Sequence, residues 1–163
     1  MDYMKKYEYW LNSDAIDEKD REELKSIAGN EKEIEDRFFK DLSFGTGGIR
    51  GVRWIGTNRM NKYVIRKVTQ GLANYMLSFD EKAAKEKGII IAHDCRIGSR
   101  EYALNTARVM AANGIKAYIY ESLRSTPELS FGVRYKGCMS GIVVQLLIIL
   151  QNTMDIKFIG KME

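Results

Sequence analysis

The sequence predicts an α/β fold: a three-layer α/β/α domain with a largely parallel, mixed sheet, preceded by helices. From residue 88 onward, short β-branched runs alternate with helical segments, which is typical of parallel strands joined by right-handed crossovers. Before residue 44, apolar residues recur at helical spacing instead. The chain of 163 residues is long enough for one domain with a buried core, and it contains neither an internal repeat nor a linker.

Residues 1–43 are predicted to form a helical segment of the same domain. One helix is expected over Glu18–Ile27, with Asp14 and Asp17 as candidate N-caps. A second is expected over Glu31–Asp41. A glycine-rich turn then leads into a probable strand.

A long helix is predicted after Asn61, which is a candidate N-cap. The apolar positions that follow recur on one face of a 3.6-residue period, so this helix should cover the sheet. These positions are Val64, Val68, Leu72, Tyr75 and Met76.

The remaining elements alternate. Strands are expected at Ile89–Ala92, at Ile115–Tyr120 and from Gly141 onward. Ser99 is expected to cap the first intervening helix, which Asn113-Gly114 ends. The second has the capping-box pair Ser125 and Glu128, Pro127 in its first turn, and Gly137 at its end.

Composition excludes several classes of protein. The net charge of +4 is mild, and the basic residues are interspersed with acidic ones, so we expect no nucleic-acid binding. There is no apolar run of about 18 residues and no signal-peptide pattern, so we expect a cytoplasmic protein without membrane contact. Cys95 and Cys138 form no metal pattern and are predicted to be buried free thiols.

The first candidate site is the glycine cluster Gly45–Gly51, which contains Arg50. Glycines allow backbone N–H groups to approach a bulky oxyanion, and a guanidinium suits phosphate. A structural turn is the alternative interpretation. A dinucleotide-binding turn is disfavoured, because it requires a strand before it and a helix after it, whereas here the order is reversed.

The second candidate is His93-Asp94-Cys95-Arg96, at the carboxyl end of a predicted strand, where ligands of open α/β sheets bind. Arg96 could face an anion, or it could pair with Asp94 to hold the loop. His93 is interpreted as a packed or partly exposed side chain rather than a base. The third segment, Ser122–Leu129, is fully explained as a strand-to-helix turn with a good cap.

Together these segments resemble the α-D-phosphohexomutase family, the phosphoglucomutases and phosphomannomutases, in their first domain. Phe44–Gly51 resembles the opening motif of bacterial phosphoglucomutases, and His93–Arg96 resembles their Tyr/His-Asp-Ser-Arg turn. Ser125–Phe131, followed by Gly141–Val144, is similar to the lead-in to their active serine. By motif position, the resemblance implies that the residues that bind substrate or phosphate are Thr46, Gly47, Gly48, Arg50 and Arg96.

The resemblance stops after Val144. In the family this strand continues into T-A-S-H-N-P, whose serine carries the phosphate, whereas this chain reads Gln145-Leu146-Leu147 and contains no later serine. Back-translation of residues 145–163 with one base restored before Gln145 yields T-A-S-H-N-P-S-E-Y-N-G-Y-K-V-Y-W-K-D-G without a stop codon. We therefore interpret residues 145–163 as an out-of-frame tail. The alternative is a longer buried strand from Ile142 to Leu150.

The expected organisation is a helical segment over residues 1–43, a phosphohexomutase domain I over 44–144 and the tail. In the intact family, a phosphoserine and Mg²⁺ interconvert hexose 1- and 6-phosphates. This chain lacks the catalytic serine, so we expect it to be inactive alone, with no catalytic residue and no metal ligand. A non-catalytic module that binds a phosphosugar or a partner is the alternative. The apolar segment Val143–Leu150 also predicts self-association.

Overall fold

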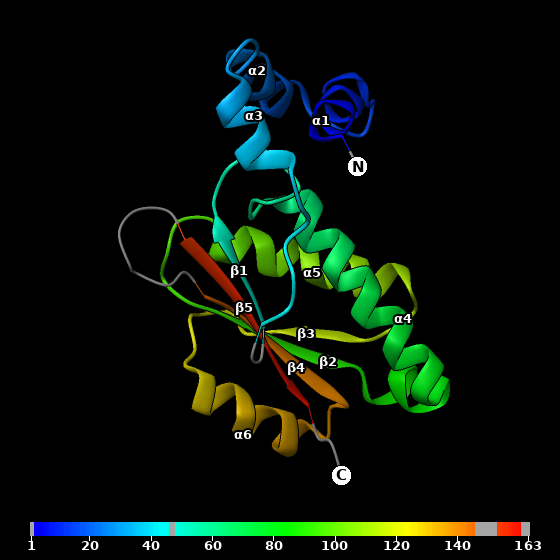
Figure 1. The fold of residues 1–163 in the computed structure, drawn as a ribbon. Coiled ribbons are helices and arrows are strands. Elements are labelled where there is room, and N and C mark those ends of the chain that lie inside the picture. Colours follow the sequence, from blue (N-terminus) through cyan, green and yellow to red (C-terminus); the bar gives the residue numbers. More distant parts are fainter. Residues whose placement is uncertain (1, 46–47, 146–152, 161–163) are drawn as a thin grey trace.

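The computed structural model describes residues 2–45 and 48–145, and residues 153–160 as backbone (Figure 1). Three helices at the N-terminus stand apart from a layered domain that contains the sheet. The predicted fold class is confirmed: within these ranges, helices cover both faces of a mixed sheet whose centre is parallel.

The N-terminal helices are α1 (Tyr3–Asn12), α2 (Glu18–Ser26) and α3 (Glu31–Phe38). Asn30 caps α3 by accepting a hydrogen bond from the backbone N–H of Glu33 at 3.3 Å. Asp17 occupies the N-cap position of α2, but its carboxylate binds Lys62 of the layered domain instead of the helix.

A separate apolar cluster holds these helices together. Trp10 packs against this cluster and also against the core of the sheet, so it joins the two parts of the molecule. Its ring makes edge-to-face contacts with Phe38 at 5.8 Å and with Tyr63 at 5.6 Å. The buried members of the cluster are Tyr7, Ile16, Leu24, Ile27, Ile34, Phe38 and Ile55.

The sheet has the strand order β1-β5-β4-β2-β3. Its strand β2 pairs in parallel with β3 and β4. Strand β5 lies antiparallel to both β4 and β1, so β1 runs in the same direction as β2, β3 and β4. The strands are β1 (Gly48–Val52), β2 (Ile89–His93), β3 (Ala117–Ile119), β4 (Ser140–Gln145) and β5 (Thr153–Gly160).

Alternate residues of β2 pack into two different hydrophobic cores, one on each face of the sheet. Ile89 and Ile91 belong to the core under α4 (Lys62–Lys87) and α5 (Ser99–Ala112). Ile90 and Ala92 belong to the core under α6 (Thr126–Lys136), on the opposite face. This alternation follows from the period of two along a strand, and it makes β2 apolar throughout because both of its faces are covered.

Most of the predicted helix boundaries are confirmed. The side chain of Asn61 caps α4 by accepting a hydrogen bond from the N–H of Val64 at 3.0 Å. Ser125 and Glu128 form the predicted capping box of α6, which ends at Gly137 with φ 66°. Helix α4 is interrupted at Asp80, whose φ of −158° is not helical and whose carboxylate caps a new turn at Ala83.

Three expectations about local structure were wrong. Ser99 is the first residue of α5 rather than its cap, because its hydroxyl is taken by Asp94 and Gly98 occupies the N-cap position. Cys95 is exposed, because it lies in the loop after β2; only Cys138 is buried. The third strand is shorter than expected, starting at Ala117, because Ile115 still donates its N–H to the end of α5 at Met110.

Candidate anion site at the carboxyl edge of the sheet

The register of the sheet brings the predicted motifs to one edge. Arg50 of β1 lies opposite Asp155 of β5, which in turn lies opposite Gln145 at the end of β4. The neighbouring row pairs Val144 of β4 with His93 of β2. Arg50 therefore shares its row with the carboxyl end of β4, next to the row where β2 ends and the His93–Arg96 turn begins, and ligands of α/β sheets bind at such an edge. The glycine turn itself lies at the amino end of β1.

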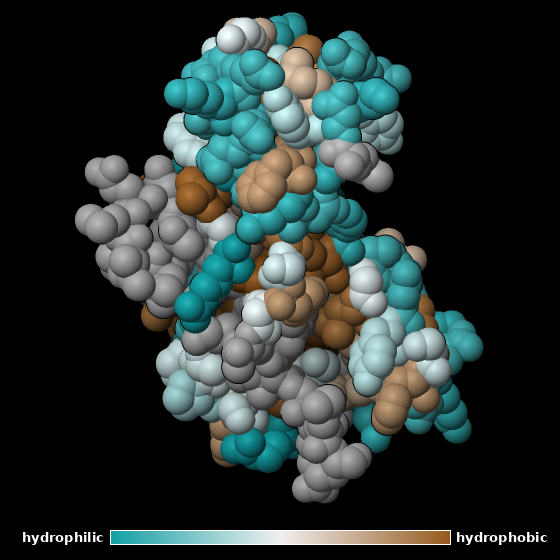
Figure 2. All heavy atoms as spheres, viewed as in Figure 1, coloured by the Kyte–Doolittle hydropathy of each residue, from teal (hydrophilic) through white to brown (hydrophobic). Residues whose placement is uncertain are grey.

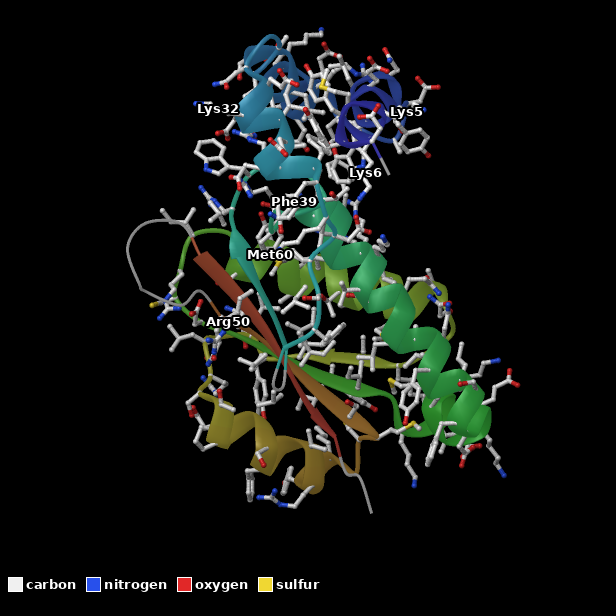
Figure 3. All side chains as sticks on the ribbon, viewed as in Figure 1. Lys5, Lys6, Lys32, Phe39, Arg50 and Met60 are labelled. Atoms are coloured by element: carbon white, nitrogen blue, oxygen red, sulfur yellow. The ribbon has the colours of Figure 1, made fainter. Side chains whose placement is uncertain are left out.

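Arg50 is an exposed residue on a strand whose preceding side chain is fully buried. Ile49 is 0% exposed and lies in the core shared with α4 and α5. Because side chains alternate along a strand, Arg50 lies on the other face of the sheet, the face that α6 covers. Figure 3 shows Arg50 on the side of the sheet away from α4. A guanidinium there is accessible to an anion.

Asp94 organises the turn after β2. Its Oδ1 accepts hydrogen bonds from the Ser99 hydroxyl at 2.6 Å and from the backbone N–H of Arg96 at 3.2 Å. Its Oδ2 lies 3.3 Å from Nε of Arg96, whose side chain is 27% exposed. The predicted ion pair between Asp94 and Arg96 is therefore present. This ion pair also holds the guanidinium of Arg96 in the turn after β2.

His93 is a packed side chain, as expected. It is 6% exposed, and its Nδ1 lies 3.0 Å from the carbonyl oxygen of Asp94. Its Nε2 has no hydrogen-bond partner among the residues that the structure describes. Its backbone carbonyl accepts a hydrogen bond from the N–H of Arg124 at 3.0 Å, which ties the end of β2 to the segment leading into α6.

The N-terminus of α6 completes this edge. Gln145 donates a hydrogen bond from Nε2 to the hydroxyl of Thr126 in the first turn, at 3.0 Å. Ser125 donates its backbone N–H and its hydroxyl to the Glu128 carboxylate, and these bonds lower the pKa of Glu128 below its usual value. The helix dipole adds partial positive charge at this end.

Arg124 is the residue at this edge that sequence reasoning did not single out. Its guanidinium lies over the ring of Tyr120, 5.5 Å from the centroid, and its Nε is 3.5 Å from Glu128. The segment had been explained as a helix cap alone. Nothing in the local sequence pointed to a shared edge, because the proximity of Arg124 to His93 depends on the pairing of β2 with β3.

Two of the five predicted phosphate-binding residues, Thr46 and Gly47, lie outside the described residues. Gly48 begins β1 and accepts a hydrogen bond at its carbonyl from the N–H of Gly45, at 2.8 Å. The register places Arg50 in the row of Gln145, at the carboxyl end of β4, and Gly48 two residues earlier, in the row of Val143. The order around the cluster is α3, turn, β1, as expected for a turn that does not bind a dinucleotide.

A large apolar cavity lies away from this edge. It measures about 610 Å³ and is lined by α4 and by the segment that follows α3. In Figure 2 hydrophobic residues gather between the N-terminal helices and the layered domain. The residues that line the cavity include Trp10, Leu42, Phe44, Val68, Leu72 and Tyr75. With few polar groups, this groove does not suit a phosphorylated sugar.

A metal ion has no site made by the described part of the chain. No three His, Cys, Asp or Glu side chains gather there as potential ligands. The carboxylates at the edge, Asp94 and Glu128, are held by Arg96, Ser99, Ser125 and Arg124. The described residues therefore do not fit a Mg²⁺ ion.

The fold defines the class: a three-layer α/β/α domain around a mixed sheet, with Arg50 in β1 and with Arg96 and Arg124 in the segments after β2 and β3. Residues 41–146 match the family described as "Phosphoglucomutase/phosphomannomutase, alpha/beta/alpha domain I". The chain belongs to this family and corresponds to its N-terminal domain.

Similar proteins of known sequence support the same family assignment. The chain is similar to a phosphoglucomutase of Staphylococcus epidermidis (strain ATCC 35984), with 34% identity over 136 residues, covering 82% of this chain and 24% of that protein. A phosphoglucomutase of Staphylococcus haemolyticus is 36% identical over 110 residues, covering 68% of this chain and 19% of its own length. The chain thus spans a quarter or less of the length of these relatives.

A solved structure shares the fold. The putative phosphomannomutase from Thermus thermophilus superimposes with a TM-score of 0.64 at 21% identity, covering 74% of this chain and 26% of that one. At this identity the similarity shows the fold alone. In the part of the chain that the structure describes, no helix has the length and apolarity needed to cross a membrane.

Proposed function

We propose that this chain is the first domain of a phosphohexomutase that interconverts hexose 1- and 6-phosphates, and that the chain does not catalyse this reaction by itself. In this proposal residues 1–43 are accessory helices, residues 44–144 are domain I and residues 145–163 are translated out of frame. The substrate would be a hexose phosphate, and a cytoplasmic location is part of the proposal. Mg²⁺ would be held by carboxylates outside the described residues.

The observation that carries the proposal is the alignment of Arg50 with Gln145 across β5. The chain leaves β4 at Gln145 and enters β5 at Thr153, so the connection between them starts and ends at the edge where Arg50 lies. With one base restored, codon 145 reads Thr and the codons of this connection begin Ala-Ser. A serine encoded at position 147 would follow closely on Gln145, the residue of β4 that shares a row with Arg50.

The division of labour follows from charge and chemistry. Phosphoryl transfer depends on positioning and on neutralising the charge of the phosphoryl oxygens. Arg50 would supply a fixed cation for the phosphate, and Asp94 would hold Arg96 in position for the same purpose. A covalent route also needs a hydroxyl nucleophile, and residues 145–163 contain no serine. Weak phosphate binding is therefore the most that this chain would retain.

Binding of glucose 1-phosphate tests the role of Arg50. Calorimetric titration of the wild-type chain should give weak binding that Arg50→Ala removes. Arg134→Ala is a matched control, because Arg134 lies in the last turn of α6, far along the helix from its capping box. Equal binding by the wild type and Arg50→Ala would contradict this assignment.

Restoring the reading frame tests the proposal as a whole. One base is inserted between the codons for Val144 and Gln145, and mutase activity is measured with glucose 1-phosphate and Mg²⁺. Activity is expected in the product of the corrected gene and not in the unaltered chain, and a change of the restored serine to alanine should abolish it. Genomic sequencing across the codons for Val143 to Leu147 establishes whether the base is missing in the organism.

A further inference from the structure

We propose that β1 and β4 form a strand-acceptor slot, and that residues Thr153–Gly160 fill this slot with an out-of-frame sequence. The occupant is this chain's own tail, bound in cis through its backbone. The tail would thereby complete the sheet and allow the domain to fold although its reading frame has changed. The inference rests on the frameshift of the proposed function, but it concerns the stability of this chain and does not depend on mutase activity.

The slot is defined by two ladders. Residues Thr153 to Lys157 lie opposite β1, and residues Asp155 to Gly160 lie opposite β4. Positions 155, 156 and 157 are therefore paired on both sides. Figure 1 shows β5 between β1 and β4, as expected for a central strand rather than an edge strand.

An empty slot would be costly for the fold. Among the described strands, β1 has only β5 as a neighbour in the sheet order, and β4 would lose its partner on one side. Ile49, Ile142 and Val144, whose backbones line the slot, are at most 1% exposed. Opening this region would leave backbone N–H and C=O groups of a buried sheet without partners, which protein structures avoid.

The same slot suits two unrelated sequences. The tail reads Thr-Met-Asp-Ile-Lys-Phe-Ile-Gly, and the same codons in the restored frame read Tyr-Asn-Gly-Tyr-Lys-Val-Tyr-Trp. Neither contains proline, and both are rich in β-branched or aromatic residues, which favour strands. Ladder hydrogen bonds involve only backbone atoms, so the sequence can change while the pairing persists.

The apolar register is also retained. Ile156 lies opposite both Ile49 and Val144, and Phe158 lies opposite Ile142. In the restored frame these two positions encode tyrosine and valine. Both readings thus place hydrophobic or aromatic residues opposite Ile49, Val144 and Ile142, whereas the buried Val143 lies opposite Lys157, which both readings share. A shift by one residue would exchange the two faces, so this pattern favours the observed register.

Hydrogen exchange of the full chain tests the occupancy. The amides at positions 155–157 should be protected together with those of β1 and β4. If residues 153–160 exchange at the rate of an unstructured peptide while β2 remains protected, the proposal is wrong. This result would also remove the row that joins Arg50 to Gln145 through β5, but it would leave the activity expected of the frame-restored protein unchanged, so failures of the two proposals can be told apart.

Ile156→Pro is the decisive variant, and Ile156→Val is its matched control. Proline removes a ladder donor at a position paired on both sides, whereas valine retains it. We expect Ile156→Pro to lower protection of the β1 amides by up to roughly tenfold, since one buried hydrogen bond accounts for up to about a factor of ten. Ile156→Val should keep wild-type protection. Equal protection of β1 in both variants would overturn the proposal.

Addition of a peptide distinguishes a slot from a general loss of stability. The peptide Tyr-Asn-Gly-Tyr-Lys-Val-Tyr-Trp, added to the full-length Ile156→Pro chain, should restore protection of β1. The same peptide with proline at its fourth position should not. Restoration by neither peptide would contradict a sequence-tolerant slot. Sedimentation of the wild type tests occupancy in cis: a dimer formed by exchange of residues 153–160 would overturn it, whereas a monomer would support it and would contradict the self-association predicted from Val143–Leu150.

Discussion

The hydroxyl of Ser99 donates a hydrogen bond of 2.6 Å to Oδ1 of Asp94, and Ser99 is completely buried. This pair links the turn after β2 to the first residue of α5. The same carboxylate accepts from the N–H of Arg96 and pairs with its guanidinium. Asp94 therefore sets both the start of a helix and the position of an arginine at the candidate site.

The first prediction concerns this pair. Asp94→Ala should reduce the free energy of unfolding by about 1–3 kcal/mol, because it leaves the buried Ser99 hydroxyl without an acceptor. Ser99→Ala should cost less, about 1 kcal/mol. Urea denaturation of the double variant should show no larger loss than Asp94→Ala alone. Additive losses would mean that the two side chains do not act as a unit.

The second prediction contrasts two glycines. A Cβ on Gly141 would lie 2.6 Å from Cγ2 of Val133, so α6 packs directly on the backbone of β4 there. Gly141→Ala should lower the free energy of unfolding by about 1–3 kcal/mol through overpacking. Gly71→Ala is the control, because nothing lies within 4 Å of a Cβ in the middle of α4. It should stabilise by about 0.5–1 kcal/mol, and thermal unfolding reports both changes.

The third prediction concerns pH. Hydrogen bonds from the Ser125 backbone and hydroxyl lower the pKa of Glu128 below 4.5. Its carboxylate therefore contributes stability that is present above that value and is lost as the pH falls through the lower pKa of the folded state. Glu128→Gln keeps an acceptor but takes up no proton. The stability difference between wild type and Glu128→Gln should shrink from about pH 6 to about pH 3, and a constant difference would contradict this.

The fourth prediction concerns the N-terminal helices. Arg37 is 6% exposed; its Nη1 lies 2.6 Å from Glu23 and its Nε 2.7 Å from Glu33. The same oxygen of Glu23 also accepts the N–H of Ile55, at 2.9 Å. Glu23→Ala should therefore cost about 2–4 kcal/mol, against about 1 kcal/mol for Glu33→Ala, which leaves Arg37 paired. Equal losses in urea denaturation would be inconsistent with this contact.

The sequence was sufficient for elements whose signals are local. The Asn61 cap, the capping box of Ser125 and Glu128, and the glycine at the end of α6 were all predicted, because each depends on residues within one helical turn. The apolar run at Ile89 predicted a strand covered on both faces. Local signals failed at Ser99, where the hydroxyl bonds to a carboxylate of the preceding loop rather than to the helix.

The sequence likewise predicted only part of the candidate site, and the tertiary structure decided the rest. The sequence alone identified the family through the order of its motifs. It also predicted Arg50 and Arg96 as site residues, and an out-of-frame tail from the codons after Val144. Tertiary structure decided which residues meet: the row from Arg50 through β5 to Gln145, the bond from Arg124 to His93, and the insertion of β5 between β1 and β4. These contacts join segments up to about a hundred residues apart, and pairing between distant strands is set by the packing of the whole sheet rather than by any one segment.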